Sequence, residues 1–363
     1  MVSMRAIICA GGTGGHIYPA LAILNKIKEM EPDSEFLYIG TTDRMEATII
    51  PEKKIPFVGI EMKGLDRKHI LKNIKVLECF QKAIQKAKEE IRKFDPDVVL
   101  GIGGYITAPV IYAAAKLGYK TFIHEQNSIP GVSNRFLSHY ATKIGVSLPG
   151  SVSYFPKKKT IYTGNPRSEE VIKAKPIDKK EYQLSKNKKL VVIVMGSLGS
   201  TSMSEKLLEL IPSFKSCSYE VLLVTGKNYY ERYQKVDTPS NVKIVPYLEN
   251  MLGVLKVTDL IVSRAGASTV AEITALGVPS ILVPSPYVTH NHQYKNAKEL
   301  ESVGATKVIT ESEFSKSTLL PAIDSILNDE KEYQTMHESA KKLGVPDSAT
   351  KIYQILKDMT KEG

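Results

Sequence analysis

The stretch RAIICAGGTGGH, residues 5–16, decides how the first half of the chain folds. Its first six residues form a short apolar and β-branched run, which predicts a buried strand. Four glycines among residues 11–15 predict a loop that backbone can approach closely, and the apolar spacing of residues 20–30 predicts a helix after it. A strand, a glycine loop and a helix in this order present backbone N–H groups to an anion or a sugar.

The second half of the chain opens in the same way. An apolar run at 190–195 leads into the glycine loop 196–200, and a helical pattern follows from about Ser204 to Leu210. Further apolar runs, each expected to be a strand, lie at 36–39, 98–102, 121–124, 221–225, 260–263 and 280–283. Near-continuous apolar strands that alternate with helices predict parallel sheets covered on both faces. The expected fold class is therefore α/β, with two Rossmann-like domains whose parallel sheets face across a cleft.

The boundary between the two domains is expected near Asn165. The stretch 166–189 is rich in Lys, Glu and Pro and contains no clean strand pattern, which is typical of a hinge region. We expect an N-terminal domain at 1–164, completed by a C-terminal helix at 346–363, and a C-terminal domain at 165–345.

Length and composition exclude several classes of protein. The chain has 363 residues, of which 42% are hydrophobic and 24% charged, so it is too long for one core and ordinary for a globular protein. No apolar run approaches the roughly 18 residues that cross a bilayer. The first ten residues pass into the glycine loop without a cleavage site, and the three cysteines lie far apart, so we expect neither export nor a disulfide framework.

The positive charge is concentrated in the first half. The formal net charge is +10, and residues 1–164 hold 23 basic and 15 acidic residues. The segment 67–93 alone holds nine basic and three acidic residues, interleaved with apolar ones. Ile70, Leu77, Ile84 and Ile91 recur every seven residues and are expected to face the core. Leu71, Val76 and Phe80 lie off this stripe, so the part around 67–80 is either a docking surface for anionic lipid or a solvated basic helix.

Glycine-rich and polar motifs follow several of the predicted strands. Ligands of open parallel sheets collect beyond the carboxyl ends of the strands, so these motifs are expected to share one crevice between the domains. They are Gly11–His16, Gly103–Gly104, Glu125–Asn127, Gly196–Ser200 and Gly266–Glu272. The pair Asp95 and Asp97 resembles a metal-binding D-x-D motif but precedes its strand, so we interpret it as a turn at the opposite end.

Two side chains next to these loops are candidates for chemistry. The first glycine loop either lets backbone N–H groups approach an anion or a sugar, or is a tight turn in which Thr13 caps the helix. His16 follows this loop and is either a general base or a surface or core histidine without a catalytic role. Glu272 lies one turn inside the helix that follows Ser263, where small residues allow a diphosphate to meet the first free amides. Its carboxylate suits ribose hydroxyls, or else it closes a capping box with Ser268 or Thr269.

Six motifs together resemble the MurG family of N-acetylglucosaminyltransferases, which convert lipid I to lipid II in peptidoglycan synthesis. They run in order along nearly the whole chain: Gly11–His16, Gly103–Tyr105, His124–Asn127, Gly164–Pro166, Ser263–Glu272 and Gln293–Ala297. The resemblance implies an inverting enzyme of the two-domain GT-B fold that transfers N-acetylglucosamine from UDP-N-acetylglucosamine to the 4-hydroxyl of the N-acetylmuramoyl unit.

The same resemblance implies a role for individual residues. His16 would be the general base, and Gly103, Gly104 and Tyr105 would bind the acceptor. The donor would be held by Thr13, Gly14, Gly15, Asn127, Arg167, Ser197, Leu248, Ala267, Ser268, Thr269, Val270, Ala271, Glu272 and Gln293. No metal and no cofactor would be required.

The expected partners are UDP-N-acetylglucosamine, lipid I, an anionic membrane surface and cell-wall synthesis or division proteins, with no nucleic acid. Because the acceptor carries a polyprenyl tail, the expected location is peripheral, at the cytoplasmic face of the bacterial cell membrane. The alternatives are a diacylglycerol or sterol glycosyltransferase, a UDP-sugar 2-epimerase and a non-catalytic nucleotide-binding protein. An NAD-dependent oxidoreductase is disfavoured, because neither glycine loop has the G-x-G-x-x-G spacing.

Overall fold

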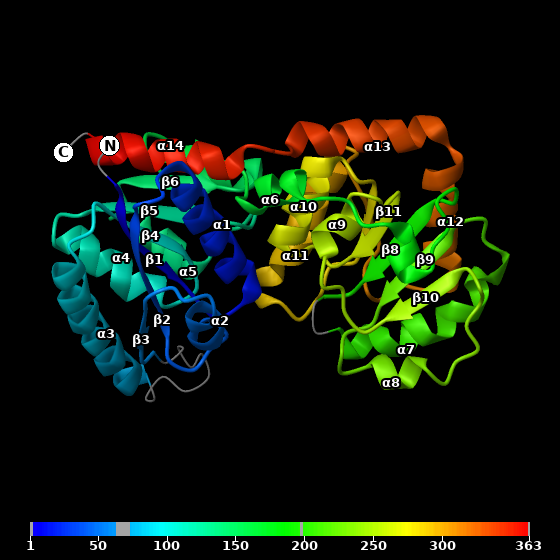
Figure 1. Ribbon diagram of the computed structural model, residues 1–363, viewed down its shortest axis with the longest axis horizontal. Coiled ribbons are helices and arrows are strands. Elements are labelled where there is room, and N and C mark those ends of the chain that lie inside the picture. The colour runs from blue at the N-terminus through cyan, green and yellow to red at the C-terminus, as the bar shows by residue number, and fades with distance from the viewer. Residues whose placement is uncertain (1–2, 63–72, 197–198, 362–363) are drawn as a thin grey trace. The chain divides into compact units, whose positions relative to one another are not determined.

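The computed structural model describes residues 3–62, 73–196 and 199–361 (Figure 1). The chain divides into two compact units, Met1–Arg167 with Asp347–Gly363, and Ser168–Pro346. The division falls a few residues later than the expected 164/165 boundary, so that Asn165, Pro166 and Arg167 belong to the N-terminal unit. Among the described residues, no helix has both the length and the apolar composition needed to cross a bilayer.

The N-terminal unit is built on a seven-stranded sheet in the order β3-β2-β1-β4-β5-β6-β7, and every strand pair is parallel. The strands are β1 (Arg5–Ala10), β2 (Glu35–Thr41), β3 (Phe57–Ile60), β4 (Val98–Gly103), β5 (Lys120–Glu125), β6 (Lys143–Val146) and β7 (Thr160–Tyr162). The helices of this unit are α1 (Gly14–Met30), α2 (Glu46–Glu52), α3 (Asn73–Phe94), α4 (Thr107–Lys116), α5 (Val132–Leu137) and α14 (Ser348–Lys361), with the short helix η2 (Pro149–Tyr154).

Both faces of this sheet are buried, as the continuous apolar strands predict. Alternate residues of β1 enter different cores: Ile7 and Cys9 pack with residues of α3 and α4, whereas Ala6 and Ile8 pack with residues of α1 and α14. From β1 the sheet extends to β2 and β3 on one side and to β4–β7 on the other, so the strand order reverses its direction next to β1. Loops at the carboxyl end of such a strand are the usual ligand-binding position of open parallel sheets.

The C-terminal unit contains a second parallel sheet, in the order β10-β9-β8-β11-β12-β13. Its strands are β8 (Leu190–Val194), β9 (Glu220–Val224), β10 (Val242–Val245), β11 (Leu260–Ser263), β12 (Ser280–Leu282) and β13 (Lys307–Val308). Its helices are α7 (Thr201–Leu210), α8 (Tyr230–Tyr233), α9 (Met251–Leu255), α10 (Ala267–Leu276), α11 (His292–Ser302), α12 (Lys316–Asn328) and α13 (Glu330–Leu343), and α6 (Arg167–Lys173) begins at the division. The short helices are η3 (Lys179–Tyr182), η4 (Ile211–Ser216) and η5 (Thr289–Asn291).

The sequence interpretation of α3 is partly wrong. Ile91 is fully buried and Ile84 packs against the core, but Leu77 is 60% exposed, while Phe80 packs inward instead. The buried face follows Phe80, Ala83/Ile84, Ala87 and Ile91, which is the spacing of a straight helix. A strict seven-residue repeat drifts by about 20° per heptad on such a helix, so the predicted stripe leaves the core. Residues 67–72 of the predicted docking segment lie outside the described residues.

Helix α14 returns the end of the chain to the N-terminal unit. Ile352 and Leu356 are fully buried in the core that contains α1. At the edge of this contact the buried carboxylate of Glu31 accepts hydrogen bonds from the Tyr353 hydroxyl at 2.7 Å and from the Met4 amide at 3.1 Å, and it pairs with Lys357. Burial raises the pKa of Glu31, but the contacts with Lys357 and Tyr353 outweigh it and hold that pKa below its ordinary value of 4.5.

Removing the Tyr353 hydroxyl tests this contact. We expect Tyr353→Phe to lower the free energy of unfolding by about 1–2 kcal/mol at pH 7, because a buried carboxylate loses a hydrogen bond. The ionised Glu31 stabilises the fold above its unfolded pKa, and this contribution is lost as the pH falls through the lower folded value. The difference between the two proteins in urea unfolding should therefore shrink below about pH 4.5. Tyr154→Phe, at a half-exposed tyrosine of the same unit, is the control and should change little.

Candidate functional site

The first glycine loop fixes the orientation of His16. Thr13 is the N-cap residue of α1, but its side chain makes no capping hydrogen bond, so the expectation that Thr13 caps the helix is wrong. The His16 Nδ1 lies 3.0 Å from the carbonyl oxygen of Gly11. A carbonyl can only accept, so Nδ1 carries the proton and, in the neutral ring, Nε2 carries the lone pair. This is the tautomer that a general base needs if it acts through Nε2.

The second loop, at the end of β4, packs directly against the first. The Gly11 amide donates to the Gly103 carbonyl at 3.1 Å. Gly103 and Gly104 both have positive φ, +133° and +90°. A Cβ on Gly103 would lie 2.4 Å from the His16 ring, and one on Gly104 would lie 2.4 Å from the Gly11 carbonyl oxygen. Only glycine therefore allows these two loops and the imidazole to share this space.

A buried hydrogen-bond network holds the end of β4, where the second loop begins. The Gln126 side-chain amide donates to the Ile102 carbonyl and to His124 Nδ1, the latter at 3.2 Å. His124 Nε2 donates to the Gly164 carbonyl at 3.0 Å. Burial lowers the pKa of His124 to about 4, so this ring is neutral and has no access to substrate. The carboxylate of Glu125 accepts from the Asn127 amide at 3.0 Å and fixes the loop that carries Asn127.

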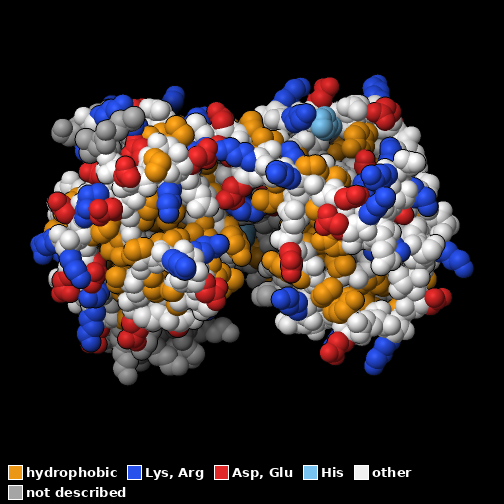
Figure 2. Space-filling model, in the orientation of Figure 1, with side chains coloured by type: hydrophobic (Ala, Val, Ile, Leu, Met, Phe, Trp, Pro, Cys, Tyr) orange, Lys and Arg blue, Asp and Glu red, His pale blue; other side chains and the backbone are white. Residues whose placement is uncertain are grey.

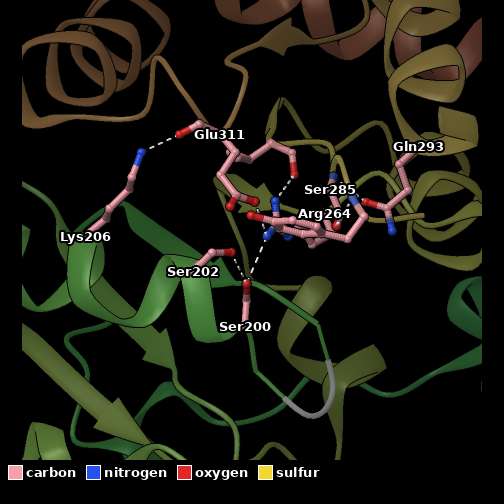
Figure 3. A network of polar contacts seen from close by, with 9 residues as sticks. Ser200, Ser202, Lys206, Arg264, Ser285, Gln293 and Glu311 are labelled. Carbon is pink, nitrogen blue, oxygen red and sulfur yellow. Dashed lines mark hydrogen bonds and ion pairs between the residues drawn. The ribbon is translucent and has the colours of Figure 1, made fainter.

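In the C-terminal unit, Arg264 joins the loops after three strands (Figure 3). Its guanidinium pairs with Glu311 at 2.6 Å and donates to Ser200 Oγ at 2.9 Å and to the Val283 carbonyl at 3.1 Å. Both side chains of the ion pair are about nine-tenths buried. Breaking a buried pair leaves an uncompensated charge, so Arg264 fixes its own loop, after β11, to the loops after β13, β8 and β12. Ser197 and Leu198 lie outside the described residues.

The start of α10 suits an anionic ligand. Its N-cap is Gly266, which has no side chain to satisfy the first amides. Ser268 Oγ, in the first turn, is buried and has no hydrogen-bond partner among the described residues. The expected alternative that Glu272 closes a capping box is wrong, because Glu272 lies six residues past the N-cap. Its side chain is largely buried, next to Ala271 and Val270.

The remaining candidate donor residues lie in each unit as follows. Gln293, near the start of α11, accepts from the Ser285 amide at 2.9 Å, which ties it to the irregular loop after β12. Leu248 follows β10 and is buried. Arg167 belongs to the N-terminal unit, where its guanidinium lies 5.6 Å from the Tyr18 ring. Asp97 accepts from the Arg5 amide at the start of β1, which confirms that the D-x-D pair lies at the opposite end of the sheet.

Comparisons with known proteins agree with this architecture. Residues 6–146 match the glycosyltransferase family 28 N-terminal domain, and residues 190–352 match the C-terminal domain of the same family. The chain belongs to glycosyltransferase family 28. Two similar relatives of this family-28 chain are transferases named UDP-N-acetylglucosamine--N-acetylmuramyl-(pentapeptide) pyrophosphoryl-undecaprenol N-acetylglucosamine transferase, from Bacillus cereus and Bacillus pumilus. They are 47% and 45% identical and cover 99% and 98% of this chain, each over 100% of its own length.

Solved structures give the same fold. The crystal structure of Acinetobacter baumannii MurG is 27% identical, with a TM-score of 0.79, and covers 98% of this family-28 chain and 99% of its own. A UDP-GlcNAc 2-epimerase from Neisseria meningitidis has a TM-score of 0.66 at 16% identity over 98% of this chain and 100% of its own. That second likeness shows the fold alone. The expected GT-B class of two α/β domains with parallel sheets is confirmed.

Three residues of the candidate site were not predicted from the sequence: Arg264, Glu311 and Glu46. Arg264 stood inside a quoted motif without a role, and its partner Glu311 lies 47 positions away. Glu46 lies outside every motif quoted above, although it is completely buried beneath the first glycine loop. The only available signal for Glu46 was a carboxylate shortly after a predicted strand, at the edge of the sheet where ligands collect.

Substituting Gly104 tests the contact between the two N-terminal loops. Gly118 is the matched control, since its φ is +89° but a Cβ there would meet nothing within 4 Å. We expect both Gly104→Ala and Gly118→Ala to cost about 1 kcal/mol of stability from the left-handed backbone. Only Gly104→Ala should also reduce glycosyl transfer, by about 100-fold, because it displaces the His16 loop. Equal activity of the two variants in a transfer assay would contradict the proposed importance of this contact.

Proposed function

We propose that this chain transfers N-acetylglucosamine from UDP-N-acetylglucosamine to the 4-hydroxyl of the N-acetylmuramoyl unit of lipid I, which forms lipid II with inversion at the anomeric carbon. The observation that carries the proposal is the orientation of His16. Its Nδ1–H is committed to the Gly11 carbonyl, so the neutral ring presents its lone pair from Nε2 beside Gly103. The names of relatives 45–47% identical over nearly the whole chain support the choice of donor and acceptor.

The reaction needs one base and one stabilised leaving group. Nε2 of His16 takes the proton from the attacking hydroxyl while its oxygen forms a bond to the anomeric carbon. The bond from that carbon to UDP breaks on the opposite side, and UDP leaves with the electron pair. Gly103, Gly104 and Tyr105 are assigned to the acceptor, with the two glycines assigned to its diphosphate. In the N-terminal unit, Thr13, Gly14, Gly15, Asn127 and Arg167 are assigned to the donor.

The C-terminal unit is assigned most donor contacts. The uncapped amides at the start of α10 and the unpartnered Ser268 hydroxyl suit the diphosphate of UDP. Glu272 is assigned to the ribose hydroxyls, Gln293 to the sugar, and the backbone at Leu248 to the uracil; Ser197 and the rest of Ala267–Ala271 complete the donor set. Preorganised amides of this kind can stabilise the charge on the departing diphosphate, so we expect no metal or cofactor to be required.

The alternative activities differ in what they need. An epimerase converts UDP-N-acetylglucosamine in the absence of an acceptor, whereas a transferase transfers the sugar only when an acceptor is present. The epimerase likeness rests on 16% identity and concerns the fold, while transferase names accompany the relatives at 45–47%. A diacylglycerol or sterol glycosyltransferase would accept a lipid alcohol in place of the muramoyl hydroxyl, and supplying each acceptor separately distinguishes these cases.

A transfer assay tests the proposed function. We expect the chain to move labelled N-acetylglucosamine to a short-chain lipid I analogue and to leave UDP-N-acetylglucosamine unchanged when no acceptor is present. His16→Ala should reduce turnover by about 10²–10⁴-fold, because it removes the base, with little change in donor affinity measured by calorimetry. His139→Ala, at an exposed histidine, is the control. Conversion of the donor alone, or transfer to a sterol in preference to the analogue, would overturn the assignment.

We propose a peripheral location at a membrane for the N-terminal unit, on its described α3 surface. Leu77 is exposed there, and the exposed faces of α3 carry several Lys and Arg side chains together with Glu89 and Glu90, which lie within 4 Å of Lys86. Figure 2 shows this mixture of basic and acidic side chains over α3, at the left edge of the view. An exposed leucine on a helix whose described part has more basic than acidic residues is suited to an anionic lipid surface, to which the acceptor's tail is confined.

Vesicle binding tests the docking surface. We expect stronger binding to vesicles that contain anionic lipid than to neutral ones, and weaker binding as salt rises, because the attraction is electrostatic. Leu77→Asp should weaken this binding. Ile172→Asp, which places the same charge at an exposed isoleucine of α6, should leave it unchanged. Equal binding of wild type to neutral and anionic vesicles at low and high salt would reject the proposal.

A further inference from the structure

A buried carboxylate lies directly beneath the first glycine loop. Glu46, the first residue of α2, is completely buried. Its Oε2 accepts from the Gly12 amide at 3.0 Å. Its Oε1 accepts from the Thr41 amide at 3.0 Å and from the Thr41 hydroxyl at 2.7 Å. All three partners are donors, which is the environment of an ionised carboxylate.

The surrounding backbone makes room for this carboxylate. A Cβ on Gly11 would lie 2.3 Å from Glu46 Oε1, and a Cβ on Gly40 would lie 2.5 Å from Glu46 Cγ. Two glycines, one in the loop after β1 and one in β2, are thus required by the position of one side chain. Glu46 therefore requires glycine at position 11, whether or not a ligand also approaches the first loop.

One peptide unit connects Glu46 to His16. The Gly12 N–H and the Gly11 C=O belong to the same peptide group, and none of the described peptide bonds is cis. In a trans peptide these two groups point in opposite directions. Glu46 accepts from the N–H on one side, and His16 Nδ1–H donates to the C=O on the other. The Glu46 carboxylate, the Gly11–Gly12 peptide and the His16 imidazole therefore form a chain of two hydrogen bonds in this order.

We propose that Glu46 is a positioning residue that orients and polarises His16 through the Gly11–Gly12 peptide. The carboxylate fixes the plane of the peptide, and the carbonyl then fixes the tautomer of the ring. A negative charge at the N–H end polarises the peptide and makes its carbonyl a stronger acceptor, since hydrogen bonds in a chain reinforce one another. The imidazolium that forms when His16 takes a proton is stabilised in the same way. The inference rests on the proposed role of His16 as the base.

The other ionisable groups around Glu46 do not replace it in this arrangement. Burial raises the pKa of the Cys9 thiol and of the Tyr38 hydroxyl, and Glu46 raises both further, so the two are neutral near pH 7. Arg44, with Asp43 beside it, faces Glu46 from the loop before α2, and a hydrogen bond with Tyr105 raises the pKa of Arg44. Glu46 is therefore the one described acidic side chain that contacts the peptide next to His16.

The experiment compares Glu46→Gln, Glu46→Asp and the control Glu52→Gln, an exposed carboxylate of the same helix. The first readout is ¹⁵N NMR of histidine-labelled protein, with His16 assigned by its loss in His16→Gln. We expect the wild-type neutral ring to be protonated on Nδ1. Glu46→Gln should lower the measured pKa of His16 and mix the two tautomers, while Glu46→Asp should restore part of the difference and Glu52→Gln should change nothing.

The second readout is the pH dependence of glycosyl transfer. Glu46→Gln should lower kcat by about 10–100-fold, which is typical of losing a group that orients a functional histidine. KM for UDP-N-acetylglucosamine should be unchanged, and the acidic limb of the profile should move to lower pH. A purely structural role for Glu46 would lower the melting temperature without moving this limb or the tautomer.

The outcomes separate this inference from the proposed function. A wild-type ring protonated on Nε2 would overturn the inference without any variant. An unchanged His16 pKa, tautomer and pH profile in folded Glu46→Gln would also overturn it, even if His16→Ala abolishes transfer. If His16→Ala transfers at the wild-type rate while NMR still shows the dependence on Glu46, the base assignment fails, and the inference that rests on it is rejected as a statement about catalysis.

Discussion

The structure of the N-terminal site depends on the close approach of two backbone loops. The amide of Gly11 meets the carbonyl of Gly103, and Gly104 lies against Gly11 with no space for a side chain. This contact places the His16 ring next to Gly103 and determines which of its nitrogens carries the proton. The orientation of a titratable side chain is thus set by main-chain atoms, which have fewer alternative conformations than a side-chain partner would have.

The parts of the fold with a strong local signal were predictable. Long apolar strands such as β1, β4 and β8 were identified because burial on both faces leaves a continuous run in the sequence. The edge strands β7 and β13 have only three and two residues, none of them fully buried, so no apolar run marks them, whereas the equally short but buried β11 and β12 were predicted. On α3 the sequence pattern placed Leu77 in the core and Phe80 outside it, and the structure shows the reverse. The reason is that a seven-residue repeat does not match a helix with 3.6 residues per turn.

The candidate site was predictable where glycine or a helix start marked it, and not where one buried charge supports it. Gly103 and Gly104 are visible in sequence, because adjacent glycines after a strand suggest close contact. Glu46 lies 34 positions from Gly12, whose amide donates a hydrogen bond to it, and Arg264 lies 47 positions from Glu311. Pairing between distant positions is set by the packed fold, so no spacing or periodicity in one sequence reveals it.

The helices also differ in how their first backbone amides are satisfied. Helices α1, α7 and α10 follow glycine-rich or small-residue loops and begin without a side-chain cap. By contrast, α13 begins with Asp329, whose carboxylate accepts from two backbone amides. A cap stabilises a helix by about 1 kcal/mol, and α1, α7 and α10 lack it, as do α2, α4, α5 and α11. What sets α1, α7 and α10 apart is the glycine-rich or small-residue loop before them, which lets an anion approach the first amides.

The return of α14 to the N-terminal unit has a consequence for synthesis on the ribosome. Every residue of Ser168–Pro346 is translated before the helix that completes the core around α1. The C-terminal unit is therefore an insertion within the N-terminal one, and it can acquire its complete set of contacts first. Until α14 emerges, the apolar surface of α1 and one face of the first sheet stay partly uncovered, so the nascent N-terminal half is the part that most needs protection from aggregation.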